Sequence, residues 1–296
     1  AKEGEIKLIE MPVRANGKEL PKIQIIDMMN EIRAGNSGNF STQLLSDLAK
    51  VINDKKQAMI FINRRGYSSF MMCRECGYVA KCHDCDVSLV YHREDNRLKC
   101  HYCGKQYKVL DQCPKCGSDK IKQGAVGTEK VVDQLKSIFP DVKILRMDND
   151  TTSKKNAHQK ILSEFAATKP AILVGTQMIA KGHDFEDVTL VGIVDADQSL
   201  YRSDYRSTER CFQLITQVSG RAGRSQWEGK VDLQTYSPRH YVYKFAANYD
   251  YKAFFKKEAN IRQTAQFPPF SKIIRILFSH SDENVVKNEL KSCYNK

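Results

Sequence analysis

"AILVGTQMIAKGHDFEDVTLVGIVDAD", residues 171–197, contains two apolar runs separated by a polar loop with two glycines. The runs "AILV" and "VTLVGIV" are too short for helices and rich in β-branched residues, which favours strands. Neither run alternates apolar with polar residues, so we expect both faces of each strand to be buried, as in a parallel sheet covered by helices on both sides. This stretch therefore predicts an α/β fold.

The flanking segments continue the alternation of helices and strands, which predicts a doubly wound parallel sheet. Within this pattern Thr128 is expected to cap a helix and Pro140 to end it. The expected helices are "STQLLSDLAKVIND" (41–54), "TEKVVDQLKSIFP" (128–140), "KKNAHQKILSEFAAT" (154–168) and "TERCFQLITQVSG" (208–220), and the further strands are "QAMIFIN" (57–63), "VKILRMD" (142–148) and "GKVDLQTY" (229–236).

The composition is that of a soluble globular protein with a basic surface. Hydrophobic residues make up 41% of the 296 residues, and 47 Lys and Arg against 35 Asp and Glu give a formal net charge of +12. This charge suggests a polyanionic partner such as nucleic acid, with a solvated basic surface as the alternative. No apolar run approaches the ~18 residues of a membrane helix, so we expect no membrane association.

The first residues, "AKEGEIKLIEMP", lack the apolar stretch of a secretory signal and do not begin with methionine. We therefore expect an intracellular chain that is part of a longer protein. Beyond residue 250, "YKAFFKKEANIRQTAQFPPFSKIIRILFSH" (251–280) predicts a basic aromatic helix, a double proline and one strand without an evident partner. We interpret this segment as the start of a further α+β domain.

Eight of the ten cysteines form four C-x-x-C pairs within one stretch. Each pair can supply two ligands to a tetrahedral zinc ion. A disulfide cluster is the competing interpretation, but it is typical of secreted chains, and nothing in the sequence suggests export. Eight zinc-bound thiolates would lower the net charge from +12 to about +8. The pairs are Cys73/Cys76, Cys82/Cys85, Cys100/Cys103 and Cys113/Cys116.

The spacing between the pairs predicts two nested zinc sites, inserted after the strand "QAMIFIN". Five residues separate the first two pairs, which is short for a hairpin, whereas fourteen separate the middle two, enough for two strands and a turn at "EDN". Four thiolates leave no coordination position for water, so both zinc ions are expected to be structural. The inner site is assigned to Cys82, Cys85, Cys100 and Cys103, and the outer site to Cys73, Cys76, Cys113 and Cys116.

Polar loops follow several expected strands, at the sheet edge where doubly wound folds bind ligands. They are "INRRGYSS" (62–69), "GTQMIAKGHDF" (175–185) and "DADQSLYRSDYRS" (195–207). A further stretch, "QVSGRAGR" (217–224), closes the next helix and holds two arginines in a glycine-containing turn. Arginine stays charged and can bind phosphate through two hydrogen bonds, so the turn is a candidate phosphate-binding element; two surface arginines in a flexible turn are the alternative.

In this order, "INRRGY", "GTQMIAKGHDF" and "QVSGRAGR" resemble late motifs of the superfamily two helicases. The eight-cysteine insertion directly after "FINRRGYSSFMMC" (61–73) makes the chain similar to the replication-restart DNA helicases of that superfamily. The resemblance covers nearly the whole chain, and the ordered set is more specific than any one motif. It implies a RecA-like second helicase lobe with an inserted zinc-ribbon module.

The resemblance also implies roles for individual residues. Arg221 and Arg224 would neutralise charge that develops on the phosphoryl group of ATP, held with Mg between two lobes. As alternatives, Arg64 and Arg65 could be merely solvated after their strand, and Thr128 could cap a helix without binding a ligand. The residues that would bind ATP or couple it to DNA are Lys181, Gly182, Asp184, Gln217 and Gly220, and those that would face DNA are Asn63, Arg64, Arg65, Thr128, Gly175, Thr176 and Gln177.

The family resemblance implies an ATP-dependent 3′ to 5′ DNA helicase of the primosome. Such an enzyme would recognise stalled or branched replication forks and help to reload the replicative helicase. Its partners would be forked DNA with a single-strand/duplex junction, the single-strand DNA-binding protein, and other primosome and helicase-loader proteins. It would work in the bacterial cytoplasm, associated with the nucleoid.

This sequence departs from the full family pattern, because it contains no G-x-x-x-x-G-K-[ST] loop and no D-E-x-H-type motif. We therefore expect half an ATP site that does not hydrolyse ATP alone. The expected domains are 1–45 as a connection from a missing first lobe, 46–72 and 118–249 as the two parts of the second lobe, 73–117 as the two-zinc insertion and 250–296 as a truncated C-terminal domain.

Two other classes of function are possible. A non-enzymatic zinc-ribbon module that binds nucleic acid or protein explains the cysteines and the charge, but it has no need of "QVSGRAGR". An α/β hydrolase or reductase is disfavoured, since the chain lacks G-x-S-x-G and a GxGxxG turn after a strand. The basic residues and tyrosines of the zinc module could contact a displaced DNA strand or dock primosome proteins, and we favour both roles.

Overall fold

The computed structural model describes residues 7, 9, 17–63, 70–92, 95–123, 127–152, 156–180, 185–202, 204–224, 227–274, 276, 278, 280 and 282–294. Residues 1–254 form one compact unit and residues 255–296 a second. Within the described segments, no helix combines the length and the apolar character that are needed to cross a membrane.

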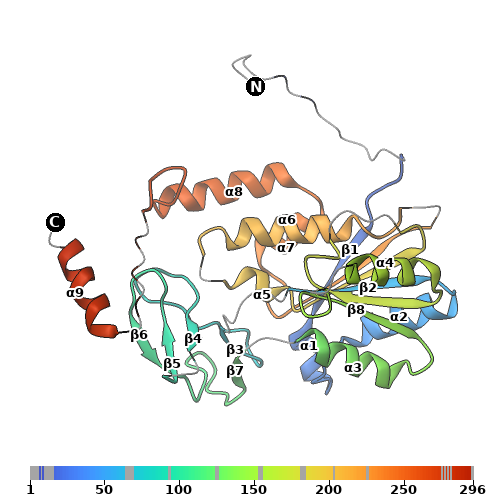
Figure 1. The fold of residues 1–296 in the computed structure, drawn as a ribbon, viewed down its shortest axis with the longest axis horizontal. Helices are drawn as coiled ribbons and strands as arrows, with labels where there is room; N and C mark the ends of the chain where they lie inside the picture. Colours follow the sequence, from blue (N-terminus) through green and yellow to red (C-terminus); the bar gives the residue numbers. More distant parts are fainter. Residues whose placement is uncertain are drawn as a thin grey trace. The chain divides into compact units, whose positions relative to one another are not determined.

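Strands and helices alternate along most of the chain (Figure 1). Their order is β1 (Lys22–Asp27), α1 (Met28–Arg33), α2 (Thr42–Asn53), β2 (Gln57–Ile62), β3 (Met71–Cys73), β4 (Val90–His92), β5 (Arg97–Lys99), β6 (Gln106–Lys108), β7 (Ile121–Gln123), α3 (Thr128–Ile138), β8 (Lys143–Met147), α4 (Ala157–Ala167), β9 (Ala171–Gly175), β10 (Val188–Val194), α5 (Asp197–Leu200), α6 (Ser207–Ser219), β11 (Lys230–Thr235), α7 (Tyr241–Ala247), α8 (Tyr251–Thr264) and α9 (Glu283–Tyr294).

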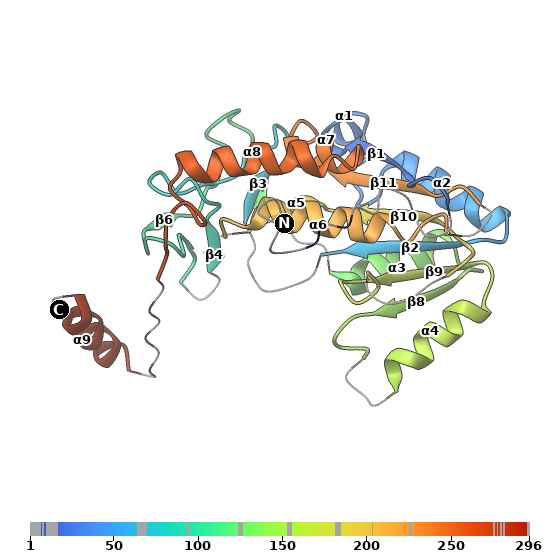
Figure 2. The ribbon, with the colours of Figure 1, turned by 90° about the horizontal axis from the view of Figure 1, so that it is seen from above.

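The first unit is built on a parallel sheet. Six strands of the described chain pair in the order β1-β11-β10-β2-β9-β8, and the labels in Figure 2 follow one another across the sheet in this order. Every neighbouring pair is parallel. Central strands β2 and β9 are buried along their whole length, which explains why their sequences are continuous apolar runs. The prediction of a doubly wound parallel sheet is confirmed.

Helices cover both faces of this sheet (Figure 1). Leu48 of α2 and Leu135 of α3 are buried in the core on one face. Phe165 of α4, Ile215 of α6 and Val242 of α7 belong to the core on the other. Burial of each such side chain contributes about 1.5–3 kcal/mol to folding. The two cores fix the helices on the sheet, and with them the loops at both sheet edges.

Strand β1 is the element of the sheet that the sequence pattern does not predict. It lies at the edge and pairs only with β11 among the described strands. Its residues alternate irregularly between exposed and buried, with Ile23 and Ile26 buried, so it lacks the apolar run of a central strand. The strand "QAMIFIN", after which the zinc module is inserted, is therefore β2, the second strand of the chain.

Thr128 does not cap α3, and that prediction is wrong. The helix begins at Thr128 itself, and the residue in the capping position is Gly127, which provides no side-chain hydrogen bond. The Thr128 hydroxyl instead donates to Asp148 Oδ2 at 2.6 Å, and Thr128 is fully buried. The helix ends at Ile138, two residues before Pro140, as expected.

The zinc module consists of two small antiparallel sheets between β2 and α3. Strands β3 and β7 pair where the chain enters and leaves the module, and β4, β5 and β6 form a three-stranded sheet. In Figure 1 the three-stranded sheet lies to the side of the large sheet, with β3 and β7 between them. The hairpin expected on both sides of "EDN" is β4 and β5, in which Tyr91 opposes Leu98.

The second unit contains the end of α8 and the whole of α9. The predicted aromatic helix is α8, but the strand expected in residues 271–280 is not formed by the described residues of that segment.

Candidate functional site

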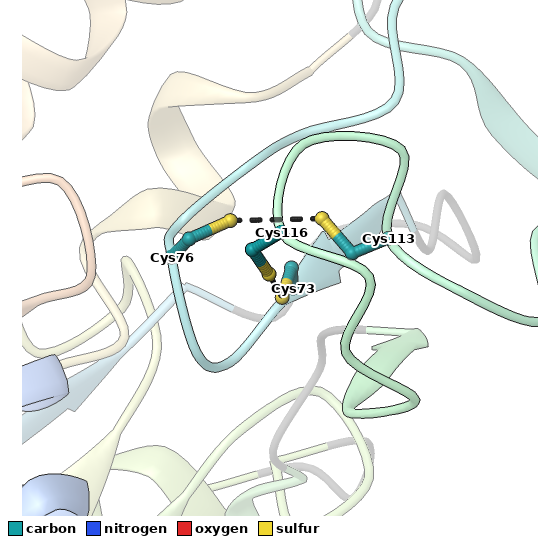
Figure 3. A group of neighbouring side chains, drawn as sticks. All are labelled: Cys73, Cys76, Cys113 and Cys116. Atoms are coloured by element: carbon teal, nitrogen blue, oxygen red, sulfur yellow. Dashed lines mark hydrogen bonds between the residues drawn. The ribbon is translucent and has the colours of Figure 1, made fainter.

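The eight paired cysteines gather into two clusters of four. Cys73, Cys76, Cys113 and Cys116 form one cluster and Cys82, Cys85, Cys100 and Cys103 the other, and within each the sulfur atoms all lie within 4.8 Å of one another. The first cluster is drawn in Figure 3. The memberships are those that the spacing of the pairs predicts. In each cluster, two sulfurs come from each of two turns distant in sequence.

The sulfur geometry fits zinc. A tetrahedral ion with Zn–S bonds of about 2.3 Å holds its sulfurs about 3.8 Å apart. The Sγ atoms of Cys73 and Cys116 are 3.7 Å apart and those of Cys76 and Cys113 are 3.6 Å apart (Figure 3). In the other cluster, the Sγ–Sγ distance between Cys82 and Cys103 is 3.6 Å. The two clusters therefore suggest two zinc ions.

The electrostatics of the clusters also call for a cation. Burial and the neighbouring thiols raise the pKa of Cys85 to about 12. Burial alone would raise the pKa of Cys82. Hydrogen bonds from the Tyr107 hydroxyl and from backbone amides of the turn outweigh it and lower this pKa to about 6. One thiolate is thus favoured and a second beside it is not, so four thiolates need a metal charge to coexist.

Each cysteine pair sits on a turn of the same kind. In every turn, the amide four residues after the first cysteine donates to the carbonyl oxygen of that cysteine, and the residue that bears this amide has a positive φ. Glycine supplies it in three turns and Asp86 in the fourth. The donors are Gly77, Asp86, Gly104 and Gly117, with N–O distances of 3.0, 3.0, 3.0 and 2.8 Å.

Several predicted site residues lie at the carboxyl edge of the large sheet. Asn63 follows β2, is buried, and donates from Nδ2 to Ser199 Oγ at 2.7 Å. Gly175 ends β9, where an added Cβ would lie 2.6 Å from the Met147 carbonyl oxygen, so the close approach of β8 itself requires glycine. Thr176 is buried, and its amide donates to the same oxygen at 3.3 Å.

A polar pocket of about 220 Å³ joins this edge to α6. It brings together three of the predicted site residues, Asn63, Gln177 and Gln217. The other side chains that line it were not predictable from the sequence, because each resembles an ordinary helix or loop residue without the fold. These are Ser199, Arg202, Arg210, Gln213 and Leu214.

The arginine turn lies at the opposite edge of the sheet. Helix α6 starts beyond the carboxyl end of β10 and returns toward its amino end, where Gly223 N donates to the Val188 carbonyl oxygen at 3.0 Å. Arg221 and Arg224 are half-buried, and Arg224 Nε donates to the Gly220 carbonyl oxygen at 2.8 Å. The remaining predicted residues, Arg64, Arg65, Lys181, Gly182 and Asp184, lie outside the described residues.

A parallel sheet covered by helices on both faces, with an inserted cysteine module, is the fold of a C-terminal helicase lobe with a zinc ribbon. Residues 120–226 match the family model described as the helicase conserved C-terminal domain. Residues 82–108 match the model described as the PriA DNA helicase Cys-rich region domain. With the relatives described next, these matches show that the chain is similar to the PriA replication restart proteins.

Curated relatives match nearly the whole chain. The replication restart protein PriA of Bacillus subtilis is 45% identical over 282 residues, which cover 95% of this chain and 35% of that protein. PriA of Synechocystis is 42% identical, covering 96% of this chain and 35% of the relative. PriA of Borreliella burgdorferi is 37% identical, covering 100% and 44%. The chain thus spans less than half the length of these relatives.

Proposed function

We propose that this chain is the second motor lobe of an ATP-dependent DNA helicase that serves replication restart. The observation that carries the proposal is the path of α6. One face of this helix lines the polar pocket together with Asn63 and Gln177, and the helix leads directly into the turn with Arg221 and Arg224. One rigid element therefore links a candidate nucleic-acid edge to a candidate phosphate-binding turn.

In this proposal Arg221 and Arg224 neutralise charge that develops on the transferred phosphoryl group. Guanidinium groups suit the task because they stay charged and can form two parallel hydrogen bonds with phosphate oxygens. Gln217 and Gly220 would help to shape the nucleotide site, and the sequence motif assigns Lys181, Gly182 and Asp184, which lie outside the described residues, to the same site. ATP and Mg are bound mainly by a first lobe, since the phosphate-binding loop motif is not found in this sequence. Mg would supply charge neutralisation at the phosphates.

The carboxyl edge of the sheet would hold the DNA backbone. In this proposal the Thr176 hydroxyl and the Gln177 side chain would bind phosphate without reading sequence, whereas the Thr176 amide is already bonded to the Met147 carbonyl oxygen. Asn63 and Gly175 lie at the same edge, and the sequence motif assigns Arg64 and Arg65, which lie outside the described residues, to the DNA contact as well. At the start of α3 the Thr128 hydroxyl is bonded to Asp148, so a DNA contact there would use backbone amides. The net charge of +12 supports a polyanionic partner.

The two zinc ions are structural in this proposal. Each would be held by four thiolates, which leaves no coordination position open for a substrate. Each ion would cross-link two turns that are far apart in sequence. The module they stabilise would contact a displaced DNA strand, other primosome proteins or both.

The remaining features of the proposal concern the whole protein. It would move 3′ to 5′, recognise stalled or branched forks, and work in the bacterial cytoplasm with the single-strand DNA-binding protein and helicase-loader proteins. The matched relatives are named replication restart proteins, which supports this context.

Steady-state ATP turnover with forked DNA tests the proposal. This chain alone should show no turnover above background at any concentration. A full-length protein that contains this chain and an upstream lobe should hydrolyse ATP in response to DNA. Turnover by the isolated chain would contradict the half-site proposal. A full-length protein that hydrolyses no ATP, with or without DNA, would favour a non-enzymatic binding module.

A further inference from the structure

Each zinc cluster extends one side chain from between two of its cysteines toward the helicase lobe. Arg74 lies between Cys73 and Cys76, and Tyr102 lies between Cys100 and Cys103. Tyr102 reaches the segment formed by residues 195–202 and 204–206, which we call the connector, and Arg74 reaches Tyr236, the residue after β11. The connector joins the carboxyl end of β10 to the start of α6.

Tyr102 contacts the end of the connector that precedes α6. The Tyr205 amide donates to the Tyr102 hydroxyl oxygen at 2.9 Å, although the two residues are 103 positions apart in sequence. Tyr205 lies two residues before α6 begins at Ser207. The inner zinc turn therefore holds the backbone at the very start of this helix.

Arg74 acts on the other end of the connector through Tyr236, whose amide donates to Asp197 Oδ2 at 2.8 Å. The Arg74 guanidinium carbon lies 4.2 Å from the centre of the Tyr236 ring, over the ring face. Burial raises the pKa of Asp195, and the charge of Arg74 opposes this shift. Asp195 Oδ1 and Arg74 Nη1 are both buried, and neither has a hydrogen-bond partner within the described part of the chain.

The outer zinc turn fits closely against the lobe. A Cβ added to Gly77 would lie 2.9 Å from the Tyr236 carbonyl oxygen, and Gly77 has a φ of +70°. In the middle of the connector, the Tyr201 ring lies 5.3 Å from the ring of Phe70, which precedes β3. The zinc module and its base thus contact the middle and the end of the connector directly, and its beginning through Tyr236.

We propose that Arg74 and Tyr102 are positioning residues through which bound zinc fixes the connector, and thereby orients α6 and the arginine turn at its far end. Zinc supplies the cross-link that keeps each turn rigid. Helix α6 has 13 residues, about 20 Å of rise, so a tilt of about 10° at its start would move its end by about 3 Å. Displacements of about 1 Å can cost catalysis 10²-fold.

This inference concerns the lobe itself, and only its activity readout rests on the proposed function. The central variant is Tyr102→Phe, which removes the hydroxyl and keeps the ring. The matched control is Tyr91→Phe in the same module, since the Tyr91 hydroxyl donates to Asn96 Oδ1 at 3.0 Å and does not join the module to the lobe. A second variant, Arg74→Lys, keeps the charge facing Asp195 but loses the planar stack on Tyr236.

Hydrogen exchange of this chain gives a readout that needs no activity. With two zinc ions per chain retained, Tyr102→Phe and Arg74→Lys should speed amide exchange in residues 204–219, and Tyr91→Phe should not. Removal of zinc by a chelator should produce the same change more strongly. Equal exchange in residues 204–219 for wild type and Tyr102→Phe, or no response of these residues to chelation, would overturn the inference.

ATP turnover of the full-length protein gives the second readout. Tyr102→Phe should lower kcat about two- to tenfold, the effect of one lost hydrogen bond, with KM for ATP and DNA affinity unchanged. Equal losses for Tyr102→Phe and Tyr91→Phe would indicate general damage and overturn the inference. If wild-type protein has no ATPase, the proposed function fails, and hydrogen exchange alone decides the positioning role.

Discussion

The amide of Gly223 donates to the carbonyl oxygen of Val188 at 3.0 Å and thereby ties the arginine turn to the amino end of β10. Gly223 has a φ of +65°, and an added Cβ would lie 2.5 Å from the backbone nitrogen of Gly229. Backbone contacts therefore shape the turn between Arg221 and Arg224, and they leave no room for a side chain at position 223.

Gly223→Ala should lower the free energy of unfolding by more than ~1–2 kcal/mol, because left-handed strain and the clash with Gly229 add. Chemical denaturation of this chain measures the loss. Gly220→Ala is the matched control, since Gly220 has no positive φ and its added Cβ would meet no atom closer than 3.6 Å. Equal stability of the two variants would show that the turn adapts to a side chain.

Thr128→Val should destabilise the chain by about 1–3 kcal/mol at neutral pH, because it removes a buried hydrogen bond to a carboxylate. Burial alone would raise the pKa of Asp148, but the hydrogen bonds from Thr128 and Arg146 outweigh burial and lower this pKa. This stabilisation is present above the ordinary carboxyl pKa and is lost as the pH falls, so the difference between wild type and variant should shrink in acid. Denaturation across pH measures it.

Two controls accompany the Thr128 variant. Thr128→Ser keeps the hydroxyl and should recover most of the lost stability. Ser137→Ala, on the same helix, removes an exposed hydroxyl and should change stability by no more than about 0.5 kcal/mol. A Thr128→Val protein as stable as wild type would argue that the bond to Asp148 contributes nothing to folding.

Cys82→Ser should leave one zinc ion per chain, because the two clusters are separate and each needs four thiolates. Metal analysis of the purified chain measures the stoichiometry. Cys293→Ser is the control and should keep two, since Cys293 belongs to neither cluster and is exposed. Loss of both ions from Cys82→Ser would mean that the sites do not form independently.

Asp197 should make the stability of the chain fall as the pH rises from about 4 to 7. Burial and the neighbouring charge of Asp195 raise the pKa of Asp197 to about 7. In this window the folded chain holds a proton that the unfolded chain has released, so the free energy of unfolding falls by up to about 1.4 kcal/mol per pH unit. Above pH 7 the contribution is constant.

Asp197→Asn should remove this slope, and the exposed Asp141→Asn should not. Denaturant titrations at several pH values measure both. Thr235 can still bond the amide, because its hydroxyl lies 3.0 Å from Asp197 Oδ1 and can turn to accept. An unchanged slope in Asp197→Asn would assign the pH dependence to another group.

The central strands were predictable because burial on both faces leaves continuous apolar runs such as "QAMIFI" and "AILVG". The edge strand β1 was not, since its one neighbour among the described strands leaves it half exposed and its pattern irregular. The cysteine clusters were also predictable, because chain length limits which pairs can meet.

Contacts between residues far apart in sequence could not be predicted. Nothing near Tyr102 indicates that its hydroxyl accepts from Tyr205, 103 residues later. Likewise, the sequence predicts that Thr128 caps α3, but Asp148 lies within hydrogen-bond distance only because β8 packs beside that helix. Local sequence specifies elements and turns, whereas the three-dimensional fold decides which polar side chains become partners.

The measurement that tests the central claim most directly is ATP turnover of the full-length protein with Arg224→Ala, beside Arg33→Ala as an exposed control in α1. The account predicts that Arg224→Ala lowers kcat on the order of 10²-fold or more while DNA affinity is kept, and that Arg33→Ala behaves as wild type. Full turnover by Arg224→Ala would contradict the assignment of the arginine turn to ATP and favour a lobe that only binds.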